Sequence, residues 1–286
     1  MSTPLSSRHP ALYFLSVGLR RLHRRLVWHL DGRRYAREQR DELLPFRVIK
    51  HQSVLLKKLG ESDMHLQRNK VVNLGIAVRP LHGLIIRPGE VFSFCLRVGP
   101  PTARRGFLPG MELSFGKARA GIGGGICQIS NLIHWMVLHS PLTVTERRHH
   151  SFDPFPDEGR VLPFGSGATV FYNYIDYQFT NTTQHTFQLR FWFSEKCLEG
   201  ELRCDVNLPY RYHVKEENHA FLKQDGAFYR QNEIWREKIE KGHNGRMLER
   251  ELVTKNFARV LYVPAGFAED DGHGGALPLQ TSPQGD

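Results

Sequence analysis

The chain has 286 residues, and 40% of them are hydrophobic, which excludes global disorder. Its formal net charge is +10, but residues 1–50 hold 11 Lys and Arg against 4 Asp and Glu, a net of +7, so the other residues together carry only +3. This uneven distribution argues against a uniformly basic surface, and nucleic acid is therefore not an expected partner.

The N-terminal 65 residues are predicted to form a basic helical region. Between residues 11 and 30, leucines recur at helical spacing while arginines at 20, 21, 24 and 25 occupy the remaining surface. The pattern fits a helix packed on its own domain. It also fits a basic amphipathic helix lying on an anionic membrane, so peripheral membrane contact through residues 11–30 stays open. A further helix is expected over about Arg33–Leu59, interrupted near Pro45.

Short strands are predicted to follow. Val71–Val78, Leu84–Ile86 and Glu90–Phe94 are apolar runs separated by Gly and Pro turns. After Gly- and Pro-rich loops between Val98 and Gly125, one helix is expected over Ile126–His139, closed by Pro141.

Further strands are predicted at Thr143–Phe152 and Ala168–Thr180. The second is expected to form a hairpin with the alternating segment Phe187–Phe193, with Tyr177 and Phe179 on its buried face and Asp176 on the other. The region 206–263 reads as a mostly β extension, and the tail 264–286 as disordered. The predicted fold class is α+β, with N-terminal helices packed on a mixed or antiparallel sheet and one glycine-led helix inserted.

The segment GGGICQIS, Gly123–Ser130, is the strongest chemical signal. Three glycines allow positive φ angles and close approach, and they deliver Cys127 to the first turn of a helix. Unpaired N–H groups and the positive end of the helix dipole stabilise a thiolate there, and the same groups suit an oxyanion. The alternative is that Cys127 is a small buried residue without chemistry.

A base for Cys127 has to come from another segment. His134 lies seven residues on, roughly 10.5 Å along the helix axis, which is too far for direct proton transfer. His149 and His150 face opposite sides of a strand, so only one of them can meet Cys127. Asp153, Asp157 and Asp176 are acids that suit the orientation of such an imidazole. The alternative is a polar rim in which Glu146 and Arg147 form a structural salt bridge.

Cysteine usage and hydropathy set further expectations. The four cysteines are too few for a disulfide framework and show neither CxxC nor zinc spacing, so no metal and no cofactor are expected. Cys197 and Cys204 could meet across a hairpin or stay reduced. No run reaches the roughly 18 to 20 apolar residues of a membrane span. A cytoplasmic location is expected, with attachment to the inner membrane face kept open.

Five phrases follow one another in the central part of the chain: NKVVNLGIAVRPLHGLIIRPGEVFSF (69–94), VGPPTARRGFLPG (98–110), GGGICQISNLIHWMVLHSPL (123–142), ERRHHSFDPF (146–155) and ATVFYNYIDYQFTN (168–181). In this order they resemble the VanW family, named for an accessory protein of vancomycin B-type resistance clusters. The resemblance covers about Asn69 to Phe193. It implies a core domain over 66–205 and a cell-envelope or glycopeptide-resistance context, but no reaction.

The resemblance also gives weight to individual positions. In this sequence they include Glu90, Ser93, Gly123, Gly124, Gly125, Cys127, Gln128, Ser130, Glu146, Arg147, His150 and Asp176. The family pattern has one histidine directly before serine, which matches His150 and leaves His149 incidental. Many relatives carry an Asp where this chain has Gly167, so Asp176 or Asp153 would have to take its place.

Two functions follow as hypotheses. In the first, the protein is a cysteine-dependent acyl-transfer or amide-cleaving enzyme acting on peptidoglycan-related peptide material. Cys127 is then the nucleophile, His150 the base, Asp176 or Asp153 the orienting acid, and Gln128 part of an oxyanion site. In the second, the protein is a non-catalytic binding or accessory module, in which the PGE-x-FSF and glycine loops shape a groove for a ligand or partner.

Overall fold

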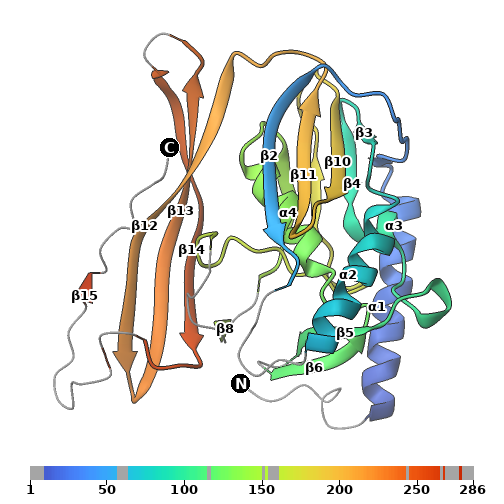
Figure 1. The fold of residues 1–286 in the computed structure, drawn as a ribbon, viewed down its shortest axis with the longest axis vertical. Helices are drawn as coiled ribbons and strands as arrows, with labels where there is room; N and C mark the ends of the chain where they lie inside the picture. Colours follow the sequence, from blue (N-terminus) through green and yellow to red (C-terminus); the bar gives the residue numbers. More distant parts are fainter. Residues whose placement is uncertain are drawn as a thin grey trace.

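The computed structural model describes residues 10–56, 64–114, 117–149, 152–153, 161–242, 245–264, 267 and 277–278. Its elements combine helices with mixed and antiparallel sheets, which confirms the predicted α+β class. The central body is built around two four-stranded sheets, with a long β ribbon beside it (Figure 1).

An antiparallel sheet forms one side of the body. Its order is β2-β11-β10-β3, from Phe46–Val54, Cys197–Cys204, Phe187–Phe193 and Leu84–Ile86. Cys197 and Cys204 stand at opposite ends of one strand and are both free, so the hairpin disulfide is excluded. The predicted helix over Arg33–Leu59 is wrong, because β1 (Arg34–Tyr35) and β2 occupy this region. From Ile49 to Val54 exposure alternates residue by residue, which is the period of a strand.

A second, mixed sheet has the order β1-β4-β9-β7, with β4 at Glu90–Ser93, β9 at Gln178–Thr180 and β7 at Thr143–Glu146. The expected hairpin between Ala168–Thr180 and Phe187–Phe193 does not form, because β9 and β10 belong to different sheets. Asn181 makes the bend by donating to the carbonyl oxygens of Ile86 and His185. Asn173, at φ +68°, turns the chain before β9. Only three residues of the expected strand pair as a strand, and Asp176 is fully buried.

Helix α4, Cys127–Leu138, packs its apolar stripe into the core between the sheets. Ile129, Ile133, Met136 and Val137 are completely buried, as the helical spacing predicts. Helix α2, Met64–Val78, replaces the strand predicted at Val71–Val78. A short apolar run has no decisive period of its own, and buried Asn73, Leu74, Ala77 and Val78 follow the helical one. Short helix α3, Phe94–Val98, follows β4, and a single 3-10 turn covers Ala103–Arg105.

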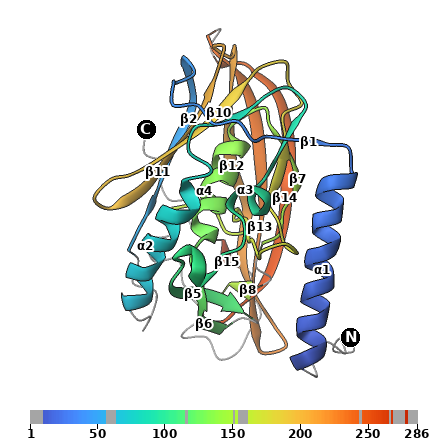
Figure 2. The same ribbon diagram turned by 90° about the vertical axis from the view of Figure 1, so that its right-hand side faces the viewer.

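Helix α1, Pro10–Leu30, lies at the edge of the body, where Figure 2 shows it standing beside the sheets. Hairpin β5-β6, Pro109–Ser114 with Lys117–Ile122, leads into the glycine loop before α4.

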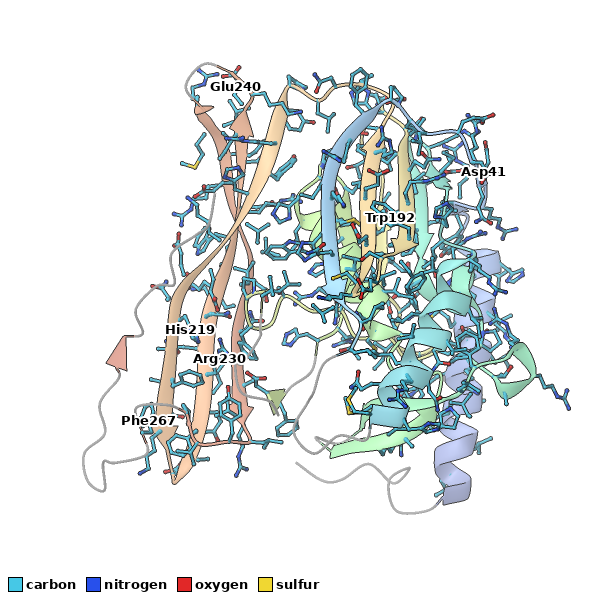
Figure 3. All side chains as sticks on the ribbon, in the orientation of Figure 1. Asp41, Trp192, His219, Arg230, Glu240 and Phe267 are labelled. Atoms are coloured by element: carbon cyan, nitrogen blue, oxygen red, sulfur yellow. The ribbon has the colours of Figure 1, made fainter. Side chains whose placement is uncertain are left out.

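The C-terminal ribbon consists of β12 (Tyr210–Gln224), β13 (Ala227–Glu240) and β14 (Met247–Val260), with β15 (Leu277–Pro278) on one edge. On its other edge β14 pairs in parallel with β8, Phe152–Asp153, a segment that precedes it by about a hundred residues. Arg230, whose position on the ribbon Figure 3 shows, is buried and pairs with Asp153 at 3.2 Å. Of the tail predicted to be disordered, 264–286, all but residues 264, 267 and 277–278 lies outside the described residues.

Candidate functional site

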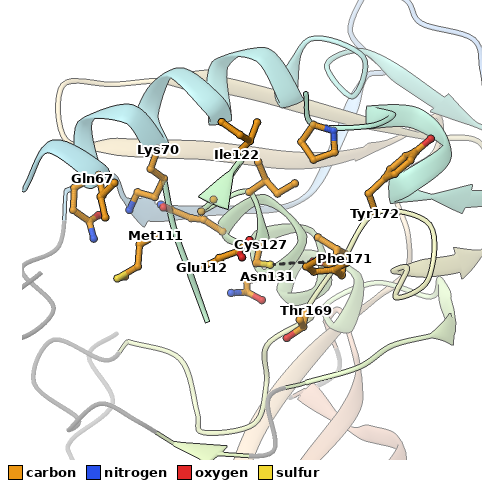
Figure 4. A pocket seen from close by; sticks show the side chains of 18 of the residues that line it. Gln67, Lys70, Met111, Glu112, Ile122, Cys127, Asn131, Thr169, Phe171 and Tyr172 are labelled. Carbon is orange, nitrogen blue, oxygen red and sulfur yellow. Dashed lines mark hydrogen bonds between the residues drawn. The ribbon is translucent and has the colours of Figure 1, made fainter. Parts of the chain in front are cut away.

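A cavity of about 440 Å³ lies at the N-terminal end of α4. Figure 4 shows Gln67 and Lys70 projecting from α2, and Cys127 and Asn131 projecting from α4, around the same space. The remaining wall comes from β5-β6, the glycine loop, the end of β2, the segments 100–102 and 169–172, and Arg21 of α1. The cavity therefore joins elements that lie far apart in the sequence.

The three glycines line this cavity and are tightly packed behind it. A side-chain carbon on Gly124 would lie 2.1 Å from the carbonyl oxygen of Gly110, so the two backbones cross without room for a methyl group. Asn73 holds the crossing: its amide nitrogen donates to the carbonyl oxygens of Leu108 and Gly124 at 3.0 Å, and its amide oxygen accepts from Leu108 N. Gly123 and Gly125 take φ values of +81° and +92°, which favour glycine.

Cys127 is the first residue of α4 and is half-buried on the cavity wall. Its thiol donates to the carbonyl oxygen of Val170 at 3.6 Å. Burial raises the pKa of the Cys127 thiol, so the resting form at neutral pH is the thiol and not the thiolate. Nucleophilic use of this sulfur requires a group that removes the proton.

Two neighbours of Cys127 in the motif hold the helix in place. The Gln128 amide nitrogen donates to Ser53 Oγ at 3.0 Å and to the Val54 carbonyl oxygen at 2.9 Å, so it fastens α4 to β2 and is not free as an oxyanion donor. The fully buried Ser130 hydroxyl donates to the carbonyl oxygen of Ala168 at 2.6 Å. These bonds fix the turn that carries Cys127.

The sequence offers three histidines as possible partners of Cys127. His150 lies outside the described residues, so its predicted contact with Cys127 stays a prediction. His149 is exposed. His134 is buried on another part of α4, with its Nδ1 3.2 Å from the Tyr177 hydroxyl, and burial lowers the pKa of its imidazole well below the usual range. His134 is a structural residue.

Asp176 belongs to a buried polar network away from the cavity walls. Its carboxylate accepts hydrogen bonds from the Ser93 hydroxyl at 2.5 Å, the Cys95 and Tyr177 backbone N–H groups at 2.8 Å, and the Gln178 amide at 3.0 Å. Burial raises the pKa of this carboxyl group. The network ties β4 to β9 and is not directed at Cys127. Asp153 is likewise engaged elsewhere, with Arg230, and Asp157 lies outside the described residues.

Glu146 and Arg147 do not form the salt bridge considered from the sequence. Glu146 accepts two hydrogen bonds of 2.6 Å from Arg24 of α1, and Arg147 donates to the carbonyl oxygens of Gly165 and Gly167. Glu90 closes its own turn by accepting from Arg87 N at 2.8 Å. The PGE-x-FSF phrase thus builds the β4 turn and the Asp176 network, and it contributes none of the cavity walls.

The most informative residue that the sequence did not indicate is Gln67. Its side chain lines the cavity, yet the residue is only 1% exposed, and its amide oxygen finds no hydrogen-bond partner within the described parts of the chain. A buried acceptor without a donor is costly, so it indicates a position where a ligand with an N–H or O–H group can bind. The only sequence signal was that Gln67 stands in a segment, 64–78, where polar residues such as Asn69 and Asn73 are interspersed among apolar ones.

The described residues contain no group of three or more His, Cys, Asp or Glu side chains arranged for a metal ion. None of the helices within those residues is long and apolar enough to cross a membrane.

Comparison with known proteins places these features in a family context. Residues 69–203 match the family model described as "VanW like protein". The Vancomycin B-type resistance protein VanW of Enterococcus faecalis is 28% identical over 258 residues, which are 90% of this chain and 94% of that protein. The Uncharacterized protein YoaR of Bacillus subtilis is 29% identical over 112 residues, 38% of this chain and 34% of that protein. No solved structure matches the chain significantly.

Proposed function

Because the chain belongs to the VanW family, we propose that it acts in a glycopeptide-resistance context by binding a peptidoglycan-related peptide in the cavity beside Cys127. The relative from Enterococcus faecalis, which aligns over nearly its whole length, supports the context. The mixed polar and apolar lining of the cavity supports a peptide as the ligand.

The unpartnered amide oxygen of Gln67 carries this proposal. An acceptor buried at the cavity wall suits the N–H group of an amide ligand, which supplies the donor that the protein lacks. Polar Thr169 and Asn131 share the cavity with apolar Met111 and Val170. A short peptide, with amide groups separated by small apolar side chains, matches this mixed lining.

A Gln67→Leu substitution tests the proposal. Leucine has nearly the shape of glutamine without the unsatisfied acceptor, so the ligand-free variant should melt at an equal or higher temperature than the wild type. Its affinity for the probe peptide diacetyl-L-Lys-D-Ala-D-Ala, measured by calorimetry, should fall by about tenfold, as expected for one lost buried hydrogen bond. The matched control is Gln52→Leu, on the exposed edge of β2 and outside the cavity wall. Equal affinity of both variants, or no binding by the wild type, refutes the proposal.

A second candidate function is cysteine-dependent acyl transfer or amide cleavage on the same kind of peptide. The position of the Cys127 sulfur on the cavity wall at the start of α4 favours it. In that reaction a base removes the thiol proton, sulfur attacks the ligand carbonyl, a thioester forms, and the amine leaves with a proton. The raised pKa of the thiol makes the base essential, and His150 is the proposed one.

Mass spectrometry separates the two functions. Incubation of the wild type with the probe peptide should yield free D-Ala, together with a Cys127 thioester that hydroxylamine removes, if acyl transfer takes place. Cys127→Ala should abolish both signals while it preserves the affinity for the peptide. If the wild type binds the peptide but releases no D-Ala, the peptide-binding function stands and the acyl-transfer function is refuted.

A further inference from the structure

Helix α1 turns three of its four arginines, Arg20, Arg21 and Arg24, towards the body and its leucines towards solvent, the reverse of an ordinary amphipathic helix in a soluble protein. Its apolar stripe, called the leucine stripe below, is between 47% and 78% exposed at every position and consists of Leu12, Leu15, Leu19, Leu22, Leu26 and Leu30. The 21 residues of the helix correspond to about 30 Å of length. Such a continuous exposed apolar face marks an interaction surface.

The opposite face of α1 is docked by specific contacts. Arg24 forms its two hydrogen bonds with Glu146, Arg20 and Arg21 stack over the rings of Tyr174 and Tyr172, and Trp28 is 8% exposed in a small apolar cluster. Rotation of the helix to bury its leucines would break all of these contacts. The leucine stripe is therefore held outward by the rest of the molecule.

Charge indicates what covers the stripe. Helix α1 contains four arginines, two histidines and no acid, and exposed Arg25 and His29 border the stripe on one side. The first 50 residues of the chain carry seven of its ten net positive charges. An apolar face with a basic border matches an anionic lipid surface, which takes up leucines between acyl chains and attracts the arginines. We propose that α1 is an in-plane membrane anchor that lays its leucine stripe into an anionic bilayer.

A second copy of the chain is the competing occupant. The leucines are spaced by three and four residues, as in a coiled coil, but stable pairs use opposite charges at the flanking positions. In a pair of α1 helices, Arg25 and His29 of both copies would lie at the flanking positions, and neither helix contains an acid to pair with them. Gly18, on the same side of the stripe, adds no side chain to this border. This arrangement disfavours self-pairing and favours lipid.

The inference is independent of the cavity, since no leucine of the stripe lines it. Flotation of the full-length protein with vesicles of equimolar phosphatidylglycerol and phosphatidylcholine tests it. The wild type should float with these vesicles and much less with phosphatidylcholine alone. The double variant Leu15→Glu/Leu22→Glu should lose at least about tenfold in partitioning, because two leucines no longer enter the bilayer.

The control Leu43→Glu/Val161→Glu adds the same charge at positions that are 54% and 76% exposed outside α1, and it should stay within about twofold of the wild type. Melting temperatures should agree among all three proteins, since every substituted side chain is exposed. Equal flotation of both double variants, or no flotation of the wild type, overturns the proposal. Light scattering tests the competing occupant. A dimer that dissociates only in the Leu15→Glu/Leu22→Glu variant would assign the stripe to a second copy of the chain and would overturn the membrane proposal.

Discussion

Replacement of Gly124 by alanine is expected to destabilise the protein through a purely steric effect. The added methyl carbon would lie 2.1 Å from the Gly110 carbonyl oxygen, 2.2 Å from its carbon and 2.9 Å from its Cα, whereas ordinary contacts begin near 3.4 Å. Both partners are backbone, and the hydrogen bonds from Asn73 hold the two segments together on both sides. Overpacking typically costs about 1–3 kcal/mol, and this rigid crossing belongs at the upper end, near 3 kcal/mol.

Urea denaturation followed by circular dichroism measures this loss in the free energy of unfolding. The matched control is Gly75→Ala in the middle of α2, where an added carbon meets nothing within 4 Å. That variant should gain about 0.5–1 kcal/mol, because alanine favours a helix more than glycine does. The two substitutions add the same methyl group and should shift the midpoint in opposite directions. A Gly124→Ala protein within about 1 kcal/mol of the wild type would refute the tight crossing behind the cavity.

Three further predictions concern titratable groups. Alkylation of Cys127 by iodoacetamide should accelerate about tenfold per pH unit between about pH 6 and 8, since its pKa lies above the usual range; a plateau below pH 7, over a Cys127→Ser background, would contradict this. Burial lowers the pKa of His51 to about 4. The unfolded chain therefore binds more protons than the folded chain between pH 4 and about 6.5. From pH 7 to pH 5 the free energy of unfolding should fall by roughly 1 kcal/mol, since solvent screens the half-buried ring, and His51→Phe should remove this loss. Arg230→Ala, which removes the cationic partner of the buried Asp153 carboxylate, should cost about 3–5 kcal/mol in urea denaturation, and the additional change Asp153→Leu should restore most of it.

The sequence was most informative where periodicity was long and local. The stripe of α4 and the alternation of β10 follow from spacing alone, and the α+β class follows from their combination. The apolar pattern was misleading in short segments. Val71–Val78 is helical and Phe46–Val54 is extended, because the partners of these segments lie far along the chain: β2 pairs with β11, about 150 residues away.

The candidate site could be predicted only in part, because only some of its residues are neighbours in the sequence. The glycine loop and Cys127 are contiguous, so the sequence placed them together, and the structure puts them on one cavity wall. Asp176 was grouped with them because of its residue type, whereas its position is set by four hydrogen-bond donors from β4, β9 and their flanks. Gln67 could not be identified in advance, because an unpaired buried acceptor exists only once the chain has folded around it.

The parallel pairing of β8 with β14 has a practical consequence for anyone who shortens this protein. The match to the family model ends at residue 203, which suggests a convenient place to cut. Yet Phe152 and Asp153 find their strand partners at Arg259 and Val260, and Leu261 N donates to the Asp153 carbonyl oxygen at 3.0 Å. A truncated gene product would leave the stretch just after His150 without its support. The minimal unit for expression and crystallisation therefore extends to at least residue 261.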